Sequence, residues 1–456
     1  MRTYFQKLLL ILPLLVSCEE FLNIEPPKNE LNGKNVFKET ATIEAAFAHI
    51  YAELRETSFT RGSNSGLPCL LGYYADELIY LNESQQATLD FYNNSVLARN
   101  FSVEQIWNSS YNLIYDCNSI LEGVEGNNSI SQNDRDRFMG EAYFIRAFIY
   151  FHLTNLYGDI PFVDSTDYQK NSKAPKTSIE IVYERVIEDM LLAKELLFSS
   201  NDNIGLFRAN HWTASAFLAR IYLYHNNWER AKEEALYIIE EGPFALEQDL
   251  SSVFIKGSRE TIWHLDPIAP GYNTPEAGTF ISLTAPPRNL SLSEELLVDF
   301  EEGDQRFVNW VGAVSNEEET WYFPFKYKLR EITQETMEYS ILSRFSELFL
   351  IAAEASARLN QTSDALYYLN IIRNRASLPS ISVNNQKELL LSILQERRIE
   401  FFSEQGHRFF DLKRTGRAHE VLSVVKPYWD ETDILLPIPD VELSKNPNLL
   451  PQNKGY

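Results

Sequence analysis

Residues 211–241 carry small apolar side chains at a spacing that restricts this part of the chain to closely packed helices. The apolar positions follow helical intervals on both sides of a turn at Asn226-Asn227, and they are Trp212, Ala216, Ala219 and Tyr222 before it and Ala231, Ala235 and Ile238 after it. Small residues on one face of each helix allow two antiparallel helices to approach closely. The segment therefore predicts a helical hairpin.

A second segment of the same kind lies at 345–372, with a turn at Asn360-Gln361. Its pattern resembles the tetratricopeptide hairpin, which repeats about every 34 residues. Such hairpins bury their apolar faces only against neighbours, and helical periodicity at 40–55, 103–121, 134–156 and 179–197 predicts those neighbours. We predict a mostly α protein on a tetratricopeptide-like helical-repeat scaffold, with helical pairs at about 40–245 and 340–417.

The stretch at about 257–330, between the two hairpins, has a different character. Six prolines interrupt any long helix, and 261–265 and 321–327 have the composition of short strands. Long irregular segments inside compact domains are more often functional than idle. We therefore predict an irregular, loop-rich insertion with short strands, which forms the ligand side of the protein.

The N-terminus has the features of an export signal. An apolar run at 8–16 is too short to span a bilayer, which takes about 20 apolar residues. Leu15-Val16-Ser17-Cys18 then resembles a bacterial lipobox, although an ordinary signal peptide with a chance cysteine is the alternative. We predict a lipoprotein signal peptide at 1–17 and a lipid anchor on Cys18 in the outer membrane. Glu19-Glu20 resembles an acidic signal for export to the cell surface.

Cys69 and Cys117 are the other cysteines of the chain. Export makes a disulfide between them possible, and no Cys-x-x-Cys or Cys/His cluster indicates a metal site. Of the two alternatives, we favour two buried free thiols.

The charge and the motifs exclude several functions. A net charge of -23 repels phosphate backbones, so nucleic acid is not an expected partner. The chain has no P-loop, dinucleotide-binding fingerprint or calcium loop, and we predict no metal and no cofactor. The acidic residues are numerous enough for a carboxylate pair that acts on a glycosidic bond, but such runs are usually solvated, and we predict that the protein is not an enzyme.

Longer segments carry a family resemblance. Glu141–Phe151 continuing to Leu156–Pro161, Glu396–Phe401 leading to Gly406–Gly416, and the terminal Leu436–Pro439 with Asn446–Leu449 resemble the signature segments of SusD/RagB outer-membrane lipoproteins. Pro451 and Lys454 depart from the usual closing segment, in a surface loop. The resemblance implies a non-catalytic receptor that captures glycans or other nutrients and passes them to a SusC-like TonB-dependent transporter.

The residues of these motifs have a structural explanation. Gly158 and Gly406 suit helix C-termini that need a positive φ. Charged residues on otherwise apolar, Phe-rich helices indicate buried ion pairs, because an unpaired buried charge is strongly unfavourable. These residues are Arg397, Glu400, Arg408 and Asp411.

The family resemblance marks no ligand residue, so loop composition is the remaining guide. Rings mixed with amides and carboxylates outside any helical pattern suit sugars, because a pyranose stacks on a ring while polar groups bind its hydroxyls. The predicted ligand residues are Trp321, Tyr322, Tyr272, Tyr73, Asp76, Tyr80, Tyr92 and Asn93, with Trp321 the strongest candidate. For each ring, packing in the core is the alternative.

Together these features predict a signal peptide at 1–17 and a single SusD-like domain at 18–456. The expected function is a surface lipoprotein that captures oligosaccharide for a transporter. The alternatives are a surface-tethered glycoside hydrolase and a helical-repeat scaffold with no small ligand.

Overall fold

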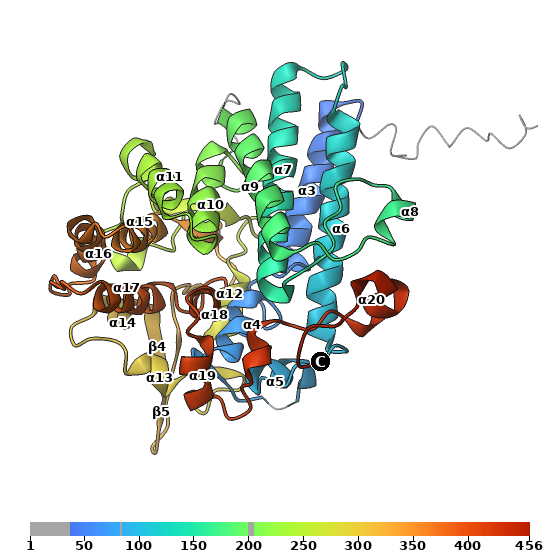
Figure 1. Cartoon of the computed structure of the whole chain (residues 1–456). Helices are drawn as coiled ribbons and strands as arrows, with labels where there is room; N and C mark the ends of the chain where they lie inside the picture. The colour runs from blue at the N-terminus through green and yellow to red at the C-terminus, as the bar shows by residue number, and fades with distance from the viewer. Residues whose placement is uncertain (1–36, 83, 199–204) are drawn as a thin grey trace, which may run out of the picture.

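The computed structural model describes residues 37–82, 84–198 and 205–456, and Figure 1 shows a largely helical protein. The longer helices are α3 (Thr40–Glu56), α6 (Phe101–Val124), α7 (Gln132–Tyr157), α9 (Ile179–Phe198), α10 (His211–Tyr224), α11 (Trp228–Glu241), α15 (Ser346–Arg358), α16 (Thr362–Arg375) and α17 (Gln386–Phe401). The shorter ones are α4 (Leu67–Tyr74), α5 (Gln86–Tyr92), α8 (Tyr168–Asn171), α12 (Pro275–Phe280), α13 (Glu294–Leu297), α14 (Gln305–Trp310), α18 (His407–Arg414), α19 (Ala418–Val425) and α20 (Asp440–Lys445). The 3₁₀ helices are η3 (Leu250–Ser252), η4 (Glu431–Ile434) and η5 (Pro447–Leu449). The strands are β1 (Leu78–Tyr80), β2 (Thr261–Leu265), β3 (Leu290–Leu292), β4 (Val311–Ser315), β5 (Thr320–Pro324) and β6 (Ser340–Arg344).

The long helices begin and end where the sequence supplies caps. The side chain of Asn100 accepts a hydrogen bond from the Ser102 amide at the start of α6, and that of Ser131 accepts one from Asp134 at the start of α7. Gly158 ends α7 with φ 76°, as predicted. The predicted helices at 40–55, 103–121, 134–156 and 179–197 are confirmed to within a few residues.

The two predicted hairpins are α10 with α11 and α15 with α16, and contacts between α11 and α15 join them. Figure 1 shows these four helices grouped on one side of the molecule, next to α7 and α9. The small residues lie at the contacts, since Ala216, Ala219, Ala231 and Ala235 are all buried. The tetratricopeptide-like scaffold is therefore confirmed.

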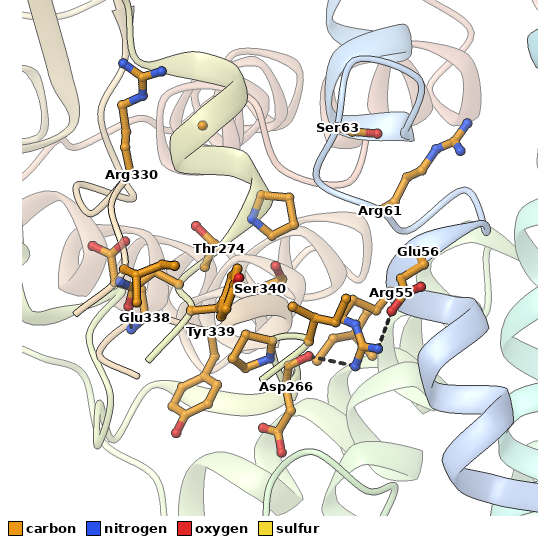
Figure 2. Close-up of a pocket in the computed structure, with 18 of the residues that line it drawn as sticks. Arg55, Glu56, Arg61, Ser63, Asp266, Thr274, Arg330, Glu338, Tyr339 and Ser340 are labelled. Carbon is orange, nitrogen blue, oxygen red and sulfur yellow. Dashed lines mark hydrogen bonds and ion pairs between the residues drawn. The ribbon is translucent and has the colours of Figure 1, made fainter. Parts of the chain in front are cut away.

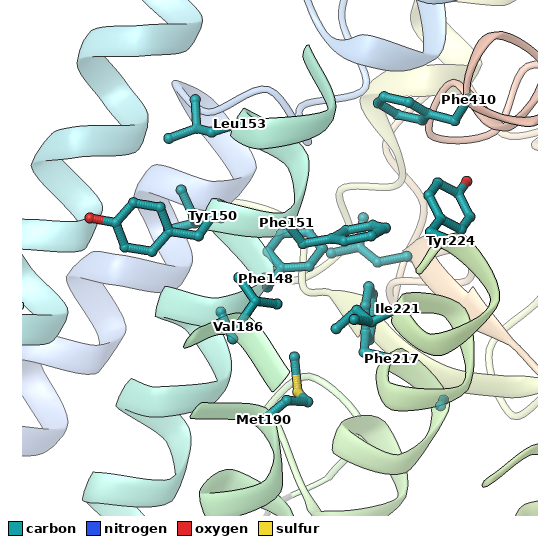
Figure 3. Packing of buried hydrophobic residues seen from close by; sticks show 14 of the residues in the cluster. Phe148, Tyr150, Phe151, Leu153, Val186, Met190, Phe217, Ile221, Tyr224 and Phe410 are labelled. Carbon is teal, nitrogen blue, oxygen red and sulfur yellow. The ribbon is translucent and has the colours of Figure 1, made fainter. Parts of the chain in front are cut away.

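Aromatic side chains fill the main core between these helices. Phe148 on α7 lies perpendicular to Phe217 on α10, with ring centroids 5.2 Å apart, and Phe151 meets Tyr224 at 5.1 Å. Figure 3 shows these rings between α7 and α10, with Phe410 approaching from the C-terminal part of the chain. Much of the high aromatic content of the chain therefore serves packing.

The segment between the hairpins is more ordered than its prolines predict. The strands form antiparallel pairs, β1 with β3, β2 with β6 and β4 with β5. The predicted strand at 261–265 is confirmed, and the one predicted at 321–327 is shorter and lies at Thr320–Pro324. A second core holds the segment together, with Trp310, Tyr327 and Phe254 buried beside Tyr73 and Tyr80 from the N-terminal half.

The loop predicted around Tyr73 is wrong, because Leu67–Tyr74 is helix α4. Each residue of α4 is buried, so the helix has no polar face. A helix that is apolar all round has no hydrophobic periodicity to recognise.

Buried ion pairs connect the C-terminal motifs, as predicted. Glu400 contacts Arg306, Arg344 and Arg375, and Arg397 contacts Asp411 at 2.8 Å. We call the connected pairs around this carboxylate, which also include Glu404, the Glu400 network. Gly406 has the predicted positive φ, 73°, but it begins α18 instead of ending a helix, and a side chain there would collide with Leu71.

Cys69 and Cys117 are buried and free, as the favoured alternative predicted. Burial raises the pKa of both thiols, which makes them poor nucleophiles. Within the described ranges, no helix combines the length and the apolar character that crossing a membrane requires.

Candidate functional site

A cavity of about 450 Å³ lies beside Tyr272, among stretches that are far apart in the sequence. The end of α3 and the loop after it form one wall, and the segments 265–275 and 330–340 with the start of α12 form the others (Figure 2). We call it the Tyr272 cavity, and the lining residues that matter below are Arg55, Glu56, Arg61, Asp266, Ile268, Tyr272, Gly278, Arg330, Glu331, Ile332, Glu338, Tyr339 and Ser340. Its volume is in the range of small-molecule sites.

The apolar part of the lining is exposed. The Tyr272 side chain is 44% exposed, and Ile268 and Ile332 are each 62% exposed. Tyr339 packs against His264, with ring centroids 4.3 Å apart. A ring and aliphatic side chains at a cavity mouth offer a surface on which the apolar face of a flat ligand can stack.

Arginines supply hydrogen-bond donors on the opposite walls. Arg55 donates hydrogen bonds to Glu56 Oε1 at 2.5 Å and to the Asp266 carbonyl at 3.3 Å, while its Nε is buried and has no acceptor within the described ranges. Arg61 donates to the Ser65 carbonyl at 3.2 Å and to Gln105 at 2.7 Å. Figure 2 shows Arg61 and Arg330 on opposite sides of the cavity.

Asn273 holds the two loops of the cavity together. Its amide nitrogen donates to the Glu331 carbonyl at 3.0 Å, and its amide oxygen accepts from the Met337 amide at 2.9 Å. Glu338 accepts hydrogen bonds from the Lys328 and Leu329 amides at 2.8 and 3.1 Å. These hydrogen bonds fix the loops that line the cavity.

Glu276 lies buried next to the cavity, where Ser340 Oγ donates to its Oε2 at 2.7 Å. Among the residues that the structure describes, no basic side chain forms an ion pair with it. Burial raises the pKa of Glu276 to about 7, and the Ser340 hydrogen bond only partly opposes this.

A second cavity, of about 300 Å³, adjoins the first at α12. We call it the Arg288 cavity, and it is lined by Gly278, Thr279, Phe280, Ile281, Ser282, Leu283, Thr284, Arg288, Asn289, Leu290 and Arg330. Gly278 and Arg330 belong to both linings. A Cβ at Gly278 would meet no atom within 4 Å, so the space between the two cavities is open there.

Of the predicted ligand residues, Tyr272 is the one that lines these cavities. Tyr73, Asp76 and Tyr80 need correction, because their side chains are buried. Tyr73 packs edge-on against Tyr80 with centroids 5.2 Å apart, in the second core. Asp76 forms ion pairs with Arg398 and Arg408 at 2.9 and 2.7 Å. Their contacts indicate that these three side chains stabilise the fold.

The other predicted residues lie away from both cavities. Trp321 is half-buried on the β4–β5 hairpin, opposite Val314. Tyr322 packs on the second core and lies near Phe307, with centroids 5.8 Å apart. Tyr92 and Asn93 are half-buried at the end of α5, and Lys426 Nζ lies 4.3 Å from the Tyr92 ring. The predicted anchor, Cys18, and the signal peptide lie outside the described residues.

The sequence analysis missed Arg55, Arg61, Arg330 and Tyr339. Arg55 lies on a well-predicted helix, where an arginine in the last turn is ordinary. Arg330 and Tyr339 flank a polar stretch, 331–338, beyond the predicted insertion. A run of polar and charged residues between two strands is the sequence feature that could have indicated this part of the cavity. In the described part of the chain, no cluster of three or more His, Cys, Asp or Glu side chains is arranged to hold a metal ion.

Two family models match the chain, one at each end. A model described as "Starch-binding associating with outer membrane" matches residues 20–223, and the SusD family model matches residues 309–456. Together they leave out mainly the segment 224–308, which contributes much of the lining of both cavities.

Individual relatives agree with these models. SusD-like protein P2 of Formosa agariphila is 29% identical over 521 aligned positions, which cover 100% of both chains. A SusD superfamily protein from Bacteroides vulgatus superposes with a TM-score of 0.78 at 20% identity, over 92% of this chain and 100% of that one. A laminarin-binding SusD-like protein superposes with a TM-score of 0.74 at 22% identity, over 91% and 99%. At these identities the two structures establish a shared fold.

Proposed function

Because the chain belongs to the SusD/RagB family, we propose that it is a surface lipoprotein that captures an oligosaccharide or another nutrient without catalysis. In this proposal it delivers the ligand to a SusC-like TonB-dependent transporter of the outer membrane. The observation that carries the binding role is the Tyr272 cavity, which combines an exposed ring with several arginine donors.

The chemistry of the cavity suits a sugar. The apolar face of a pyranose would stack on Tyr272, and sugar hydroxyls would bind the Arg55, Arg61 and Asp266 groups on the other walls. A laminarin-binding protein with the same fold supports a glycan over another kind of nutrient. Trp321, half-buried on its hairpin, is a second candidate contact outside the cavity.

A binding panel tests the proposal. Calorimetry of the purified lipoprotein against a broad set of oligosaccharides and polysaccharides should find a ligand. Tyr272→Ala should then weaken it about tenfold, because loss of one stacking ring costs on the order of 1–2 kcal/mol. Gly278→Leu, which places a side chain in the open space between the cavities, should weaken binding at least as much without lowering the melting temperature.

The matched control is Tyr168→Ala, which removes a tyrosine that is 80% exposed on α8 and lines neither cavity. Equal affinity of the Tyr272→Ala and Tyr168→Ala variants for the ligand would mean that the ligand does not bind in the Tyr272 cavity. Absence of binding to every carbohydrate tested would favour a scaffold without a small ligand. Release of reducing ends from a bound glycan would favour the hydrolase.

The anchor needs its own test, in cells. Cys18→Ala should release the protein from the membrane fraction, because the lipid attached to Cys18 holds it there in this proposal. Protease treatment of intact cells should degrade the wild-type protein if it faces the exterior. A Cys18→Ala protein that stays in the membrane fraction would contradict the lipid anchor.

A further inference from the structure

Three arginines of the two cavities have no acidic partner in the part of the chain that the structure describes. Most described arginines form an ion pair with a carboxylate, as Arg55, Arg344 and Arg408 do. Among the residues that the structure describes, those without a carboxylate at ion-pair distance are Arg61, Arg99, Arg135, Arg288 and Arg330. Three of these five line the Tyr272 or the Arg288 cavity.

The Arg288 cavity concentrates this unpaired charge. Arg288 and Arg330 both line it and both are exposed, and no described residue of its lining is acidic. Asn289 adds further donors, because its amide oxygen accepts from Asn82 at 3.2 Å while its own nitrogen has no acceptor among the described residues. The Tyr272 cavity differs, since Glu56, Asp266, Glu331 and Glu338 accompany its arginines.

The chain as a whole makes this pair of arginines unusual. A net charge of -23 favours carboxylate partners for basic side chains and repels anions at long range. At physiological salt this repulsion is screened beyond about 8 Å, so a local pair of guanidinium groups can still bind an anion. Guanidinium groups bind sulfate and carboxylate oxygens by paired, charge-assisted hydrogen bonds.

We infer that the glycan is acidic, and that Arg288 and Arg330 bind a sulfate ester or a uronate carboxylate in the Arg288 cavity while the sugar chain extends past Gly278 toward Tyr272. This inference rests on the proposed function and adds a substrate class to it. A neutral glycan would leave two exposed arginines, which have no carboxylate partner among the described residues, without a counter-charge in a cavity continuous with the ring-bearing site.

Calorimetry with the purified lipoprotein tests the inference. The probes are laminarin as a neutral glucan, polygalacturonate as a carboxylate polymer, and carrageenan as a sulfated one. The wild type should bind one of the two acidic polymers more tightly than laminarin, and the better of the two identifies the anionic group. Affinity should fall as salt rises.

Single substitutions then locate the contact. Arg288→Ala and Arg330→Ala should each weaken the acidic polymer about tenfold, the loss expected for one charge-assisted contact. Arg330→Lys should recover part of that loss. The control is Arg99→Ala, which removes the same charge from an exposed arginine that also lacks a carboxylate but lines neither cavity.

The outcomes distinguish a failure of the acidic substrate from a failure of the proposed function. Tighter binding of laminarin, or equal losses in Arg330→Ala and Arg99→Ala, would overturn the acidic substrate while a Tyr272-dependent glycan site remained. If none of the polymers bound, and the wider panel gave no ligand either, the proposed function itself would fail and the inference with it.

Discussion

The Glu400 network and the surroundings of the Tyr272 cavity shift the pKa of a buried glutamate in opposite directions. Burial opposes ionisation of Glu400, but Arg375, Arg344 and Arg306 outweigh it and hold its pKa well below the usual range. Beside the cavity, Glu276 has no basic partner among the described residues, and burial raises its pKa to about 7. In the network each carboxylate is paired with arginines, whereas Glu276 beside the cavity and the cavity arginines Arg61, Arg288 and Arg330 have no partner of opposite charge among the described residues.

The two regions also differ in how the sequence presents them. The segments with the family resemblance supply Glu400 and the Arg397–Asp411 pair, while the arginines that contact Glu400 come from other parts of the chain. The cavities are built largely from 265–290 and 330–340, which carry no recognisable motif. The residues that identify the family therefore stabilise the scaffold, and the residues that contact a ligand must be found from the structure.

The largest expected effect comes from Asp76→Ala. The sequence predicted that Asp76 contacts the ligand, whereas its ion pairs indicate that it stabilises the fold. Removing this carboxylate leaves the largely buried Arg408 without a carboxylate partner among the described residues, and leaves Arg398 with Asp299 alone. The free energy of unfolding should fall by about 3–5 kcal/mol, as is typical when one partner of a buried pair is lost. Denaturant titration measures the change.

The control for this substitution is Asp364→Ala, which removes an exposed carboxylate paired with Lys232 at 2.7 Å. Its effect on stability should be small, because surface pairs contribute little. If the Asp76→Ala variant kept the stability of the wild type and lost ligand binding, Asp76 would be a ligand-binding residue.

Glu276→Gln tests the other side of the comparison. The raised pKa means that the folded state keeps its proton up to pH about 7, while the unfolded state loses it near 4.3. The stability that Glu276 contributes is therefore complete below pH about 4 and is lost as the pH rises to about 7, by on the order of 3–4 kcal/mol. The Gln variant, which is neutral at every pH, should lack this part of the decline.

Urea titrations of both proteins at pH 5 and pH 8 measure the difference. The comparison has to be between the two proteins, because burial also raises the pKa of Glu77 to about 7 and that group titrates in both. If the stability of the two proteins depended on pH in the same way, the pKa of Glu276 would not be raised, and Glu276 and Glu400 would not differ in the way described.

The fold was largely predictable because its helices are amphipathic and repeat. The alanines of α10, α11 and α15 report close helix contacts directly. Helix α4 was not predictable, since a helix buried on all sides has no polar face, and Tyr73 was therefore assigned to a loop. Tyr80 lies on β1, which is three residues long. Burial on all sides removes the periodicity on which the prediction depends.

The site was less predictable for a related reason. Tyr272 was found because prolines and glycines mark its loop, but a cavity depends on which loops meet. Arg55, at the end of α3, and Arg330, after β5, are 275 positions apart in the sequence, and hydrogen bonds such as those of Asn273 bring the loops together. No local sequence pattern indicates which of these loops lie side by side in the folded protein.

The smallest expected effect belongs to Trp321→Ala, the substitution to which the sequence alone gave most weight. Trp321 lies half-buried on β5, outside both cavities, so its loss should change glycan affinity less than twofold, far below the effect of Tyr272→Ala. Calorimetry of the two variants against the same ligand decides between them. A tenfold loss for Trp321→Ala with a normal melting temperature would mean that the ligand extends to the β4–β5 hairpin, and that the site is a long surface in which the cavities form one part.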